Sequence, residues 1–300
     1  MIPLFTSIPP RMSRMDGAGR EIGHNYLRDC LVSWRNAGFR PITINANTEA
    51  LHPLIEELDV EVIRVSRDAS EVAGKPLVYM KDFLSAACSR SSGAIAITNA
   101  DIRLAAAPAL VKAITTLERG ACVLANRLDT QTPGSTSGKL YTDGIDFLCY
   151  HSQDLESFDA DQFIFGLPWW DHFIPVNMLF RGVRPLDVPS DFAFHLEHDE
   201  RWNYEDWRHF GYRYSRVTLQ RARAAGDPFA VSLEKAARAG RQSFHDYVAM
   251  IWRARRPKGR LKNQILTLSA TARANLEVIQ ARRVPVSPSS APSRARRGLK

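Results

Sequence analysis

A short polar cluster, Thr98-Asn99-Ala100-Asp101, ends the apolar run Ala94–Thr98, which has the length and composition of a buried strand. Asn99 and Asp101 are two positions apart, so their side chains point the same way wherever the chain stays extended. A carboxylate held at the end of a buried strand suits a divalent cation that bridges two phosphates. Asp also commonly caps a following turn, and the cluster alone leaves both roles open.

Two histidines form a second group with metal-binding chemistry. His195 and His198 lie in the segment His195-Leu196-Glu197-His198, and imidazole nitrogens are suitable ligands for Mn²⁺ or Zn²⁺. The spacing is not that of the HExxH motif, so a zinc hydrolase is not expected. The alternative is that both histidines are loop residues that make hydrogen bonds.

Asp171 follows Trp169 and Trp170 at the start of an expected helix, where the helix dipole favours a carboxylate. Such a group can accept a proton from an attacking hydroxyl, or serve only as a helix cap. Trp170 suits stacking on a sugar ring, although tryptophan is also a core residue and we expect at least one of the pair to be packing. Asp146 lies within the expected strand Ile145–Tyr150, where a charge is costly unless it is paired or binds a ligand.

Apolar runs of strand length alternate with segments of helical periodicity in the first half of the chain. This pattern is typical of an α/β fold with a mostly parallel sheet and helices on both faces. The expected strands are Pro3–Ile8, Pro41–Asn45, Val60–Val65, Ala94–Thr98, Ala121–Ala125 and Ile145–Tyr150. The expected helices are Arg20–Asn36, Glu49–Glu57, Met80–Ala87, Leu110–Leu117, Asp171–Arg181 and Leu233–Arg256. Residues 126–142, which contain Pro133-Gly134-Ser135, are expected to form a mobile loop.

Ligands of parallel α/β sheets bind at the carboxyl ends of the strands. Thr6 and Asn45 end the first two expected strands, Asp68 follows the third, and Lys81 lies on the helix before the fourth. We therefore expect these residues at the rim of a nucleotide site, where Lys81 would neutralise a phosphate. Each of them is also a common type of solvated surface residue.

The strand and helix order that leads to Asn99-Ala100-Asp101 resembles the nucleotide-binding half of GT-A-type glycosyltransferases. In that family, an Asp-x-Asp-like motif ends the fourth strand; here Asn stands at its first position. The segments Asp143-Gly144-Ile145-Asp146-Phe147 and Phe165-Gly166-Leu167-Pro168-Trp169-Trp170-Asp171 are similar to segments of bacterial glycosyltransferase-like proteins. The resemblance covers roughly residues 1–215.

The resemblance implies a Rossmann-like GT-A fold with Mn²⁺ or Mg²⁺ at Asp101, completed by a histidine from the pair His195 and His198. It implies that Asp171 is the catalytic base of an inverting transfer. The remaining contacts to the nucleotide sugar would come from Thr6, Asn45, Asp68, Lys81, Asn99, Asp146 and Trp170.

The expected function is therefore transfer of a sugar from a nucleotide-diphosphate sugar to a glycan or other hydroxyl acceptor. A sugar-phosphate nucleotidyltransferase is an alternative on a similar fold, but its Gly-rich N-terminal signature with a following Lys is missing. A non-catalytic protein that binds sugar nucleotides or an anionic surface is a third option.

The net charge of +8 is concentrated near the C-terminus, where residues 251–300 hold thirteen Lys and Arg and one acidic residue, Glu277. We expect a helical extension over residues 216–280 and a disordered basic tail over residues 281–300. The tail suits an anionic membrane surface, whereas a specific nucleic-acid interface would spread charge over a folded face. Deletion of residues 257–300 is expected to leave sugar-nucleotide hydrolysis intact.

The sequence also bears on the compartment. The start Met1-Ile2-Pro3-Leu4-Phe5 lacks the apolar run of a secretory signal, and no segment has about twenty uninterrupted apolar residues, so we expect neither a signal nor a membrane span. The four cysteines are widely separated and are expected to be reduced, buried thiols. We therefore expect a cytoplasmic protein, with peripheral attachment at the inner face of the membrane as an option.

Overall fold

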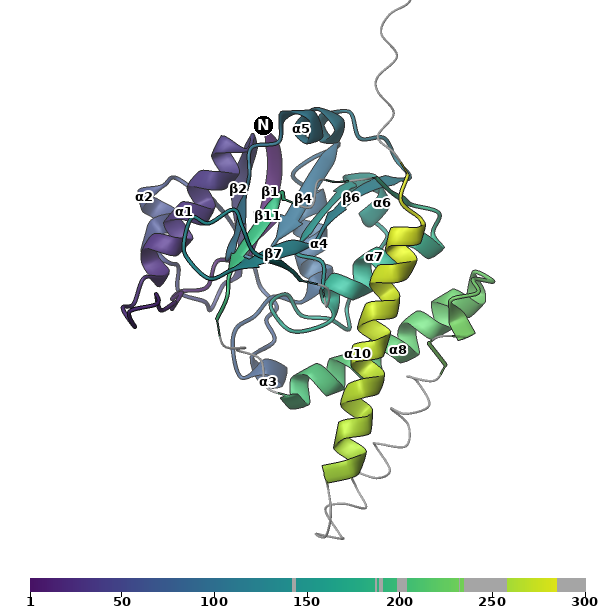
Figure 1. Cartoon of the computed structure of the whole chain (residues 1–300). Coiled ribbons are helices and arrows are strands. Elements are labelled where there is room, and N and C mark those ends of the chain that lie inside the picture. Colours follow the sequence, from purple (N-terminus) through teal and green to yellow (C-terminus); the bar gives the residue numbers. More distant parts are fainter. Residues whose placement is uncertain are drawn as a thin grey trace, which may run out of the picture.

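The computed structural model describes residues 1–141, 144–186, 188, 191–198, 204–231, 233–234 and 258–284. Its main element is a seven-stranded sheet with the order β10-β6-β9-β4-β1-β2-β3 (Figure 1). The strands are β1 (Ile2–Thr6), β2 (Phe39–Ala46), β3 (Glu61–Val65), β4 (Ala94–Thr98), β6 (Ala121–Ala125), β9 (Phe147–His151) and β10 (Arg184–Leu186). Only β9 runs antiparallel to its neighbours β4 and β6, so the predicted mostly parallel α/β sheet is confirmed.

Helices cover both faces of this sheet. One face packs against α1 (Gly23–Asn36), α2 (Pro53–Glu57) and α5 (Pro108–Thr115), and the other against α4 (Met80–Cys88), α6 (Ser152–Leu155) and α7 (Trp170–Phe180). The short helix α3 (Ser70–Ala73) precedes α4. Successive strand residues alternate between two apolar clusters, because Leu4 faces α1 and Phe5 faces α4. A strand buried on both faces has no polar side, which explains why these runs are continuously apolar in sequence.

A second, four-stranded sheet has the order β5-β11-β7-β8. It consists of β5 (Ile102–Leu104), β11 (Ala193–Leu196), β7 (Arg127–Thr130) and β8 (Lys139–Leu140). The prediction of a mobile loop over residues 126–142 is therefore wrong for two segments. Strand β7 has only four residues and pairs with β11, which is distant in sequence. The sequence of β7 itself therefore contains no pattern from which this strand could be predicted.

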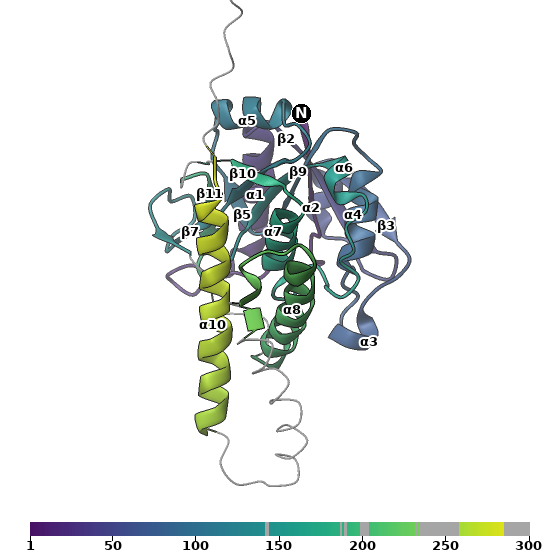
Figure 2. The ribbon, with the colours of Figure 1, turned by 90° about the vertical axis from the view of Figure 1, so that its right-hand side faces the viewer.

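Two long helices complete the structure and lie along α7 (Figure 2). They are α8 (Tyr204–Ala224) and α10 (Lys258–Ala281). The Tyr214 hydroxyl donates to Asn275 Oδ1 at 2.7 Å, and Leu268 and Ile279 are buried in the same apolar cluster as α7. Residue 215, the expected end of the first domain, lies inside α8, and the division into domains stays a prediction.

The C-terminal residues that the structure describes are joined to the sheet. Val284 donates its backbone N–H to the carbonyl of Pro185 at 2.9 Å, and Arg283 donates to the carbonyl of Leu124 at 3.0 Å. The expected disordered tail therefore begins after these contacts at the earliest. Residues 285–300, and the expected helix Leu233–Arg256 apart from residues 233 and 234, lie outside the described residues.

Among the helices that the structure describes, none combines the length and apolar composition needed to cross a lipid bilayer.

Candidate functional site

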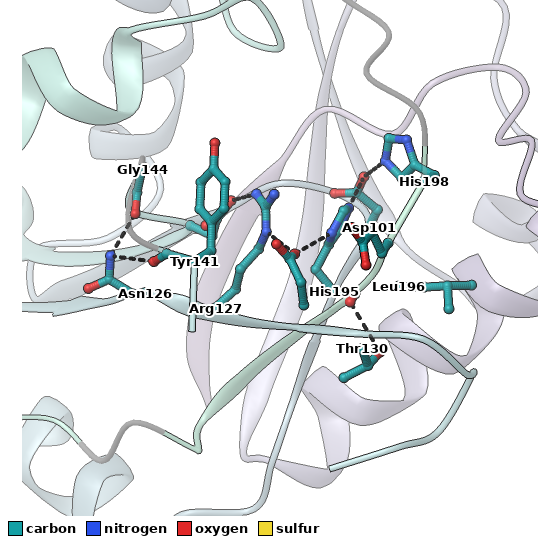
Figure 3. Close-up of polar contacts among 12 residues, drawn as sticks. Asp101, Asn126, Arg127, Thr130, Tyr141, Gly144, His195, Leu196 and His198 are labelled. Atoms are coloured by element: carbon teal, nitrogen blue, oxygen red, sulfur yellow. Dashed lines mark hydrogen bonds and ion pairs between the residues drawn. The ribbon is translucent and has the colours of Figure 1, made fainter. Parts of the chain in front are cut away.

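The register of the smaller sheet places His195 between two carboxylates. Asp101 lies in the turn between β4 and β5, and β11 pairs with β5 so that His195 is opposite Ile102. On its other side, β11 pairs with β7 so that His195 is opposite Asp129. As a result, His195 Nε2 lies 3.4 Å from Asp101 Oδ2, and His195 Nδ1 lies 3.0 Å from Asp129 Oδ1 (Figure 3).

His198 completes a group of three ligand-type side chains. Its Nε2 lies 3.7 Å from Asp101 Oδ2, and the ligand atoms of Asp101, His195 and His198 all lie within 4.8 Å of one another. One carboxylate oxygen and two imidazole nitrogens fit Mn²⁺ better than Mg²⁺, which prefers oxygen ligands. The contact of His195 with Asp129 is the kind of carboxylate support that orients metal-bound histidines. The three residues that the sequence singled out for a metal ion are thus brought together by the fold.

Arg14 is a member of this site that the sequence reasoning missed. Its side chain is buried and its Nη2 donates to Asp101 Oδ2. The chain can pass close to α1 here because the first helical residue is Gly23, where a Cβ would lie 2.2 Å from the carbonyl oxygen of Met12 and 2.9 Å from Arg14 N. A lone arginine beside a turn carries no local signal, because its partner is 87 residues away.

The charges of this group favour an ionised carboxylate. Burial raises the pKa of Asp101, but hydrogen bonds from His195 and His198 and the charge of Arg14 outweigh burial and hold that pKa well below its usual range. Burial lowers the pKa of His195, whereas its hydrogen bonds to Asp101 and Asp129 produce a net rise. The site is therefore a negative carboxylate surrounded by groups that carry or accept positive charge.

Arg127 extends the site toward a second buried carboxylate. Its Nε donates to Asp129 Oδ1 at 2.8 Å, its Nη1 donates to Asp146 Oδ1 at 2.7 Å, and its guanidinium stacks under the Tyr141 ring at 3.8 Å (Figure 3). Asp146 precedes β9, and Thr98 at the end of β4 donates its hydroxyl to the Asp146 carbonyl at 2.7 Å. Because β9 is antiparallel to β4, its start lies at the carboxyl end of β4.

Asp146 is 3 % exposed. Its Oδ2 atom has no hydrogen-bond partner among the residues that the structure describes. A buried carboxylate oxygen without a donor is costly, so this atom is suited to accept a hydrogen bond from a ligand hydroxyl. The predicted ligand role of Asp146 agrees with this placement and stays a proposal.

Asp171 lies next to Asp146 in the first turn of α7. Burial raises the pKa of Asp171. The charge of His172 opposes the rise in this pKa, the negative charge of Asp146 adds to it, and the backbone N–H of Ile145, which donates to the carboxylate, also opposes it. A Cβ on Gly144 would lie 2.6 Å from Asp171 Oδ2, so glycine is the residue that leaves room for this carboxylate.

From the sequence, Asp101 was expected to bind the metal ion and Asp171 to act as the base. In the structure, a series of neighbouring residues connects them. The series runs from Asp101 through His195, Asp129 and Arg127 to Asp146, beside which Asp171 lies. The two carboxylates are therefore on the same side of the molecule, at the carboxyl end of β4.

The prediction that Trp170 stacks on a sugar is wrong in this structure. Trp170 is 2 % exposed, and its ring stacks on Phe165 with 4.8 Å between centroids. Trp169 is also buried; its ring stacks on Tyr214 and its Nε1 donates to the carbonyl of Trp207 at 2.8 Å. Both indoles fill the core between the sheet and α8, so neither ring face is available to a ligand.

Asn45 is likewise a structural residue. It is completely buried, its Nδ2 donates to the Ile8 carbonyl at 2.9 Å and to Glu49 at 2.8 Å, and its Oδ1 accepts from Thr43 at 2.6 Å. Because the protein itself uses both ends of the amide, the predicted contact of Asn45 with a nucleotide is not supported.

The other rim residues are spread along the sheet. Thr6 is buried at the end of β1, and its hydroxyl oxygen has no partner among the described residues. Asp68 accepts from Ser70 N at 2.8 Å and from a threonine hydroxyl, and Lys81 is exposed on α4. Asn99 is half-buried, two positions before Asp101. Contacts of these four residues with a nucleotide stay predictions.

No protein-family model and no curated protein matches this chain. Among solved structures, the chain is similar to a candidate nucleotide-diphospho-sugar transferase from Desulfovibrio desulfuricans, at 15 % identity and a TM-score of 0.41, with 75 % of this chain and 95 % of that chain covered. It is also similar to a nucleotidyl transferase from Methanothermobacter, at 14 % identity and a TM-score of 0.37, with 72 % and 99 % covered.

A third solved structure, HddC from Yersinia pseudotuberculosis complexed with GMP-PN, has 9 % identity and a TM-score of 0.33, with 70 % of this chain and 97 % of that chain covered. These sequence identities and TM-scores are too low to indicate the activity of this chain.

Proposed function

We propose that this protein is a glycosyltransferase that transfers a sugar from a nucleotide-diphosphate sugar to a hydroxyl acceptor. The observation that supports the proposal is the placement of two different chemical groups at one edge of the sheet. One group, formed by Asp101, His195 and His198, is suited to a divalent cation. The other is the half-buried carboxylate of Asp171, beside Asp146. Ligands of parallel α/β sheets bind at this edge.

The cation group would hold the diphosphate end of the donor. Mn²⁺, which fits these ligands better than Mg²⁺, would offset the charge of the leaving diphosphate when bound. Asp129 orients His195 through Nδ1, and Arg14 adds a permanent positive charge at Asp101. In this arrangement, the chain itself supplies positive charge to the side of the site where negative charge develops.

Asp171 would act on the acceptor. Its carboxylate takes the proton from the acceptor hydroxyl while the hydroxyl oxygen forms a bond to the anomeric carbon and the bond from that carbon to the diphosphate oxygen breaks. A raised pKa makes Asp171 a stronger base than an ordinary aspartate. Because the attack comes from the side opposite the leaving group, we propose inversion at the anomeric carbon.

A binding experiment tests the donor half of the proposal. UDP-, GDP-, CMP- and dTDP-sugars are mixed with the full chain, with and without Mn²⁺, and the melting temperature is measured, because a ligand that binds only the folded state raises it. We expect one donor to raise the melting temperature only with Mn²⁺, and Asp101→Asn to abolish the shift. Asp29→Asn, at an exposed position of α1, is the matched control and should keep it. A shift that survives both EDTA and Asp101→Asn contradicts the metal-binding role.

The products identify the reaction. Release of a nucleotide from the sugar nucleotide supports glycosyl transfer. Release of pyrophosphate from a nucleoside triphosphate and a sugar phosphate would instead identify a nucleotidyltransferase. Binding without either reaction would indicate a non-catalytic sugar-nucleotide binding protein.

A further inference from the structure

A pocket of about 420 Å³ lies against β7, β8 and the segment between them. Its volume is within the range of about 300–1,000 Å³ that is usual for small-molecule sites. Ten residues line it, and most of them carry a hydroxyl, amide, amino or carboxylate group: Asp129, Gln131, Thr132, Ser135, Ser137, Gly138, Lys139, Leu140, Tyr141 and Glu197. None of the residues predicted from the sequence to contact ligand is among them.

We infer that this pocket binds the acceptor, and that the part of the acceptor inside it is a neutral sugar. This inference rests on the proposed function and names the class of acceptor in the transfer reaction. A sugar ring presents many hydroxyls, which the hydroxyl, amide and carboxylate groups of the lining can pair with. The lining holds two carboxylates, on Asp129 and Glu197, against one ammonium group, on Lys139. This balance disfavours a phosphate or another anion.

The pocket reaches the proposed base through Tyr141. A Cβ built on Gly144 would lie 3.1 Å from Tyr141 Cε1 and 2.6 Å from Asp171 Oδ2, so the tyrosine ring and the carboxylate both lie close to one point. Tyr141 lines the pocket, and its ring is held in place by the guanidinium of Arg127. A hydroxyl that projects from the pocket past Tyr141 would therefore meet Asp171.

Another part of the pocket lining borders the cation group. Asp129, which lines the pocket, contacts His195 Nδ1 at 3.0 Å, and Glu197 lies between His195 and His198 in sequence. The pocket lining thus includes Asp129, which contacts the cation group, and Tyr141, which lies near the proposed base. An acceptor must reach both the donor and the base, and these two lining residues favour that placement.

Contacts to neighbouring elements fix the pocket wall. Gln131 donates to Glu197, Arg103 of β5 donates to the Ser135 carbonyl, and Gly138 approaches β7 so closely that a Cβ would lie 2.3 Å from the Asp129 carbonyl oxygen. The wall is therefore tied to the strands that carry Asp129 and His195. A preformed wall reduces the ordering cost of binding.

Two substitutions that fill the pocket test the inference. Thr132→Trp and Ser137→Trp place an indole on exposed lining positions, and Thr136→Trp places the same group on an exposed residue of the same segment that does not line the pocket. The full-length proteins are compared by transfer to methyl glucoside, methyl galactoside and methyl mannoside, and by donor hydrolysis in water. Melting temperatures confirm that all three variants fold.

For the pocket variants, we expect the KM for the best methyl glycoside to rise by about tenfold or more, the scale of an imperfect fit in a specificity pocket. Donor hydrolysis and the Mn²⁺-dependent thermal shift should stay unchanged, and Thr136→Trp should match the unaltered protein. Equal transfer by the pocket variants and the control would overturn the inference, as would a preference for sugar phosphates over neutral glycosides.

Ligand-observed NMR separates failure of the pocket from failure of the proposed function. The three methyl glycosides are tested for binding to the unaltered protein without any donor. Binding that Thr132→Trp removes and Thr136→Trp keeps supports the pocket even if no transfer occurs. Donor hydrolysis without binding of any glycoside would contradict the inferred acceptor pocket but would be consistent with the proposed function.

Discussion

The carboxyl group of Asp171 is held where its charge is disfavoured. Burial raises its pKa, and the neighbouring Asp146 raises it further. The nearby cation of Arg127 is bonded to Asp146 and to Asp129. Such a placement is typical of groups that must take up a proton during a reaction.

The pH dependence of transfer should report this carboxyl group. A base works only when it is deprotonated, so kcat should fall as the pH falls through the pKa of Asp171. Because that pKa is raised, the loss should begin at a higher pH than for an ordinary aspartate, whose pKa is about 3.9. The measurement is kcat against pH at saturating donor and acceptor. An acid limb at or below the ordinary value would contradict Asp171 as the base.

Asp171→Asn should separate activity from stability. We expect kcat to fall by about 10²–10⁴-fold, the usual contribution of a general base. Because the folded-state pKa is raised, the protonated carboxyl group favours the fold below its unfolded pKa, and this stability is lost as the pH rises through the folded pKa. At neutral pH the ionised carboxylate opposes folding, so removing its charge should raise the melting temperature. Thermal unfolding at pH 7 and pH 4 measures this. A lower melting temperature at pH 7 would show that Asp171 is a stabilising cap.

The site depends on close packing between two elements: the segment that precedes β9 and the first turn of α7. Gly144 lies at this contact, with its carbonyl accepting from Asn126 Nδ2 at 2.7 Å (Figure 3). The nearest atoms to a Cβ at this position belong to Asp171 and Tyr141. A side chain at position 144 would therefore displace both the proposed base, Asp171, and a residue of the inferred acceptor pocket, Tyr141.

Gly144→Ala should displace Asp171 without removing any functional group. With 2.6 Å between the new Cβ and Oδ2, the carboxylate must move, and displacements of about 1 Å cost about 10²-fold in rate. Overpacking should also lower the free energy of unfolding by about 1–3 kcal/mol. The matched control is Gly93→Ala, because a Cβ there has nothing within 4 Å. Unchanged kcat for Gly144→Ala would show that Asp171 is not positioned here.

Elements with local signals could be predicted from the sequence, and those without could not. Strands β4 and β6 have their predicted bounds, because a run buried on both faces is apolar at every position. Strands β7, β8 and β11 are short, and β11 pairs with strands that are distant in sequence, so neither their existence nor their register was predicted. That register is what brings His195 to Asp101 and Asp129.

Helix α10 packs against the rest of the fold and is not a removable extension. Leu268 and Ile279 are buried against α7 and α8, and Asn275 accepts from Tyr214. Arg282 pairs with Asp227 at 2.8 Å. Deletion of residues 257–300 would expose this interface, so the prediction that it leaves hydrolysis intact is not supported.

Two truncations test this view. A chain that ends at Val284 should melt within about 2 °C of the full chain, whereas one that ends at residue 257 should melt at least about 10 °C lower, since each large apolar side chain contributes about 1.5–3 kcal/mol. Thermal unfolding and donor hydrolysis are measured on both. Equal melting temperatures would show that α10 is dispensable. The chain ending at Val284 also tests the predicted membrane attachment. Because it lacks four of the thirteen basic residues of residues 251–300, its binding to phosphatidylserine vesicles should be weaker than that of the full chain.

The α/β class, the central strands, and the choice of Asp101, His195 and Asp171 as candidate site residues could be read from the sequence, because they depend on local periodicity, residue chemistry and the family resemblance. Which polar residues meet could be seen only in the folded protein. Folding placed Arg14 at Asp101, buried Trp170 in the core, and enclosed Asn45 in a structural network. Such contacts depend on strand register and packing between distant segments, and no local pattern encodes either.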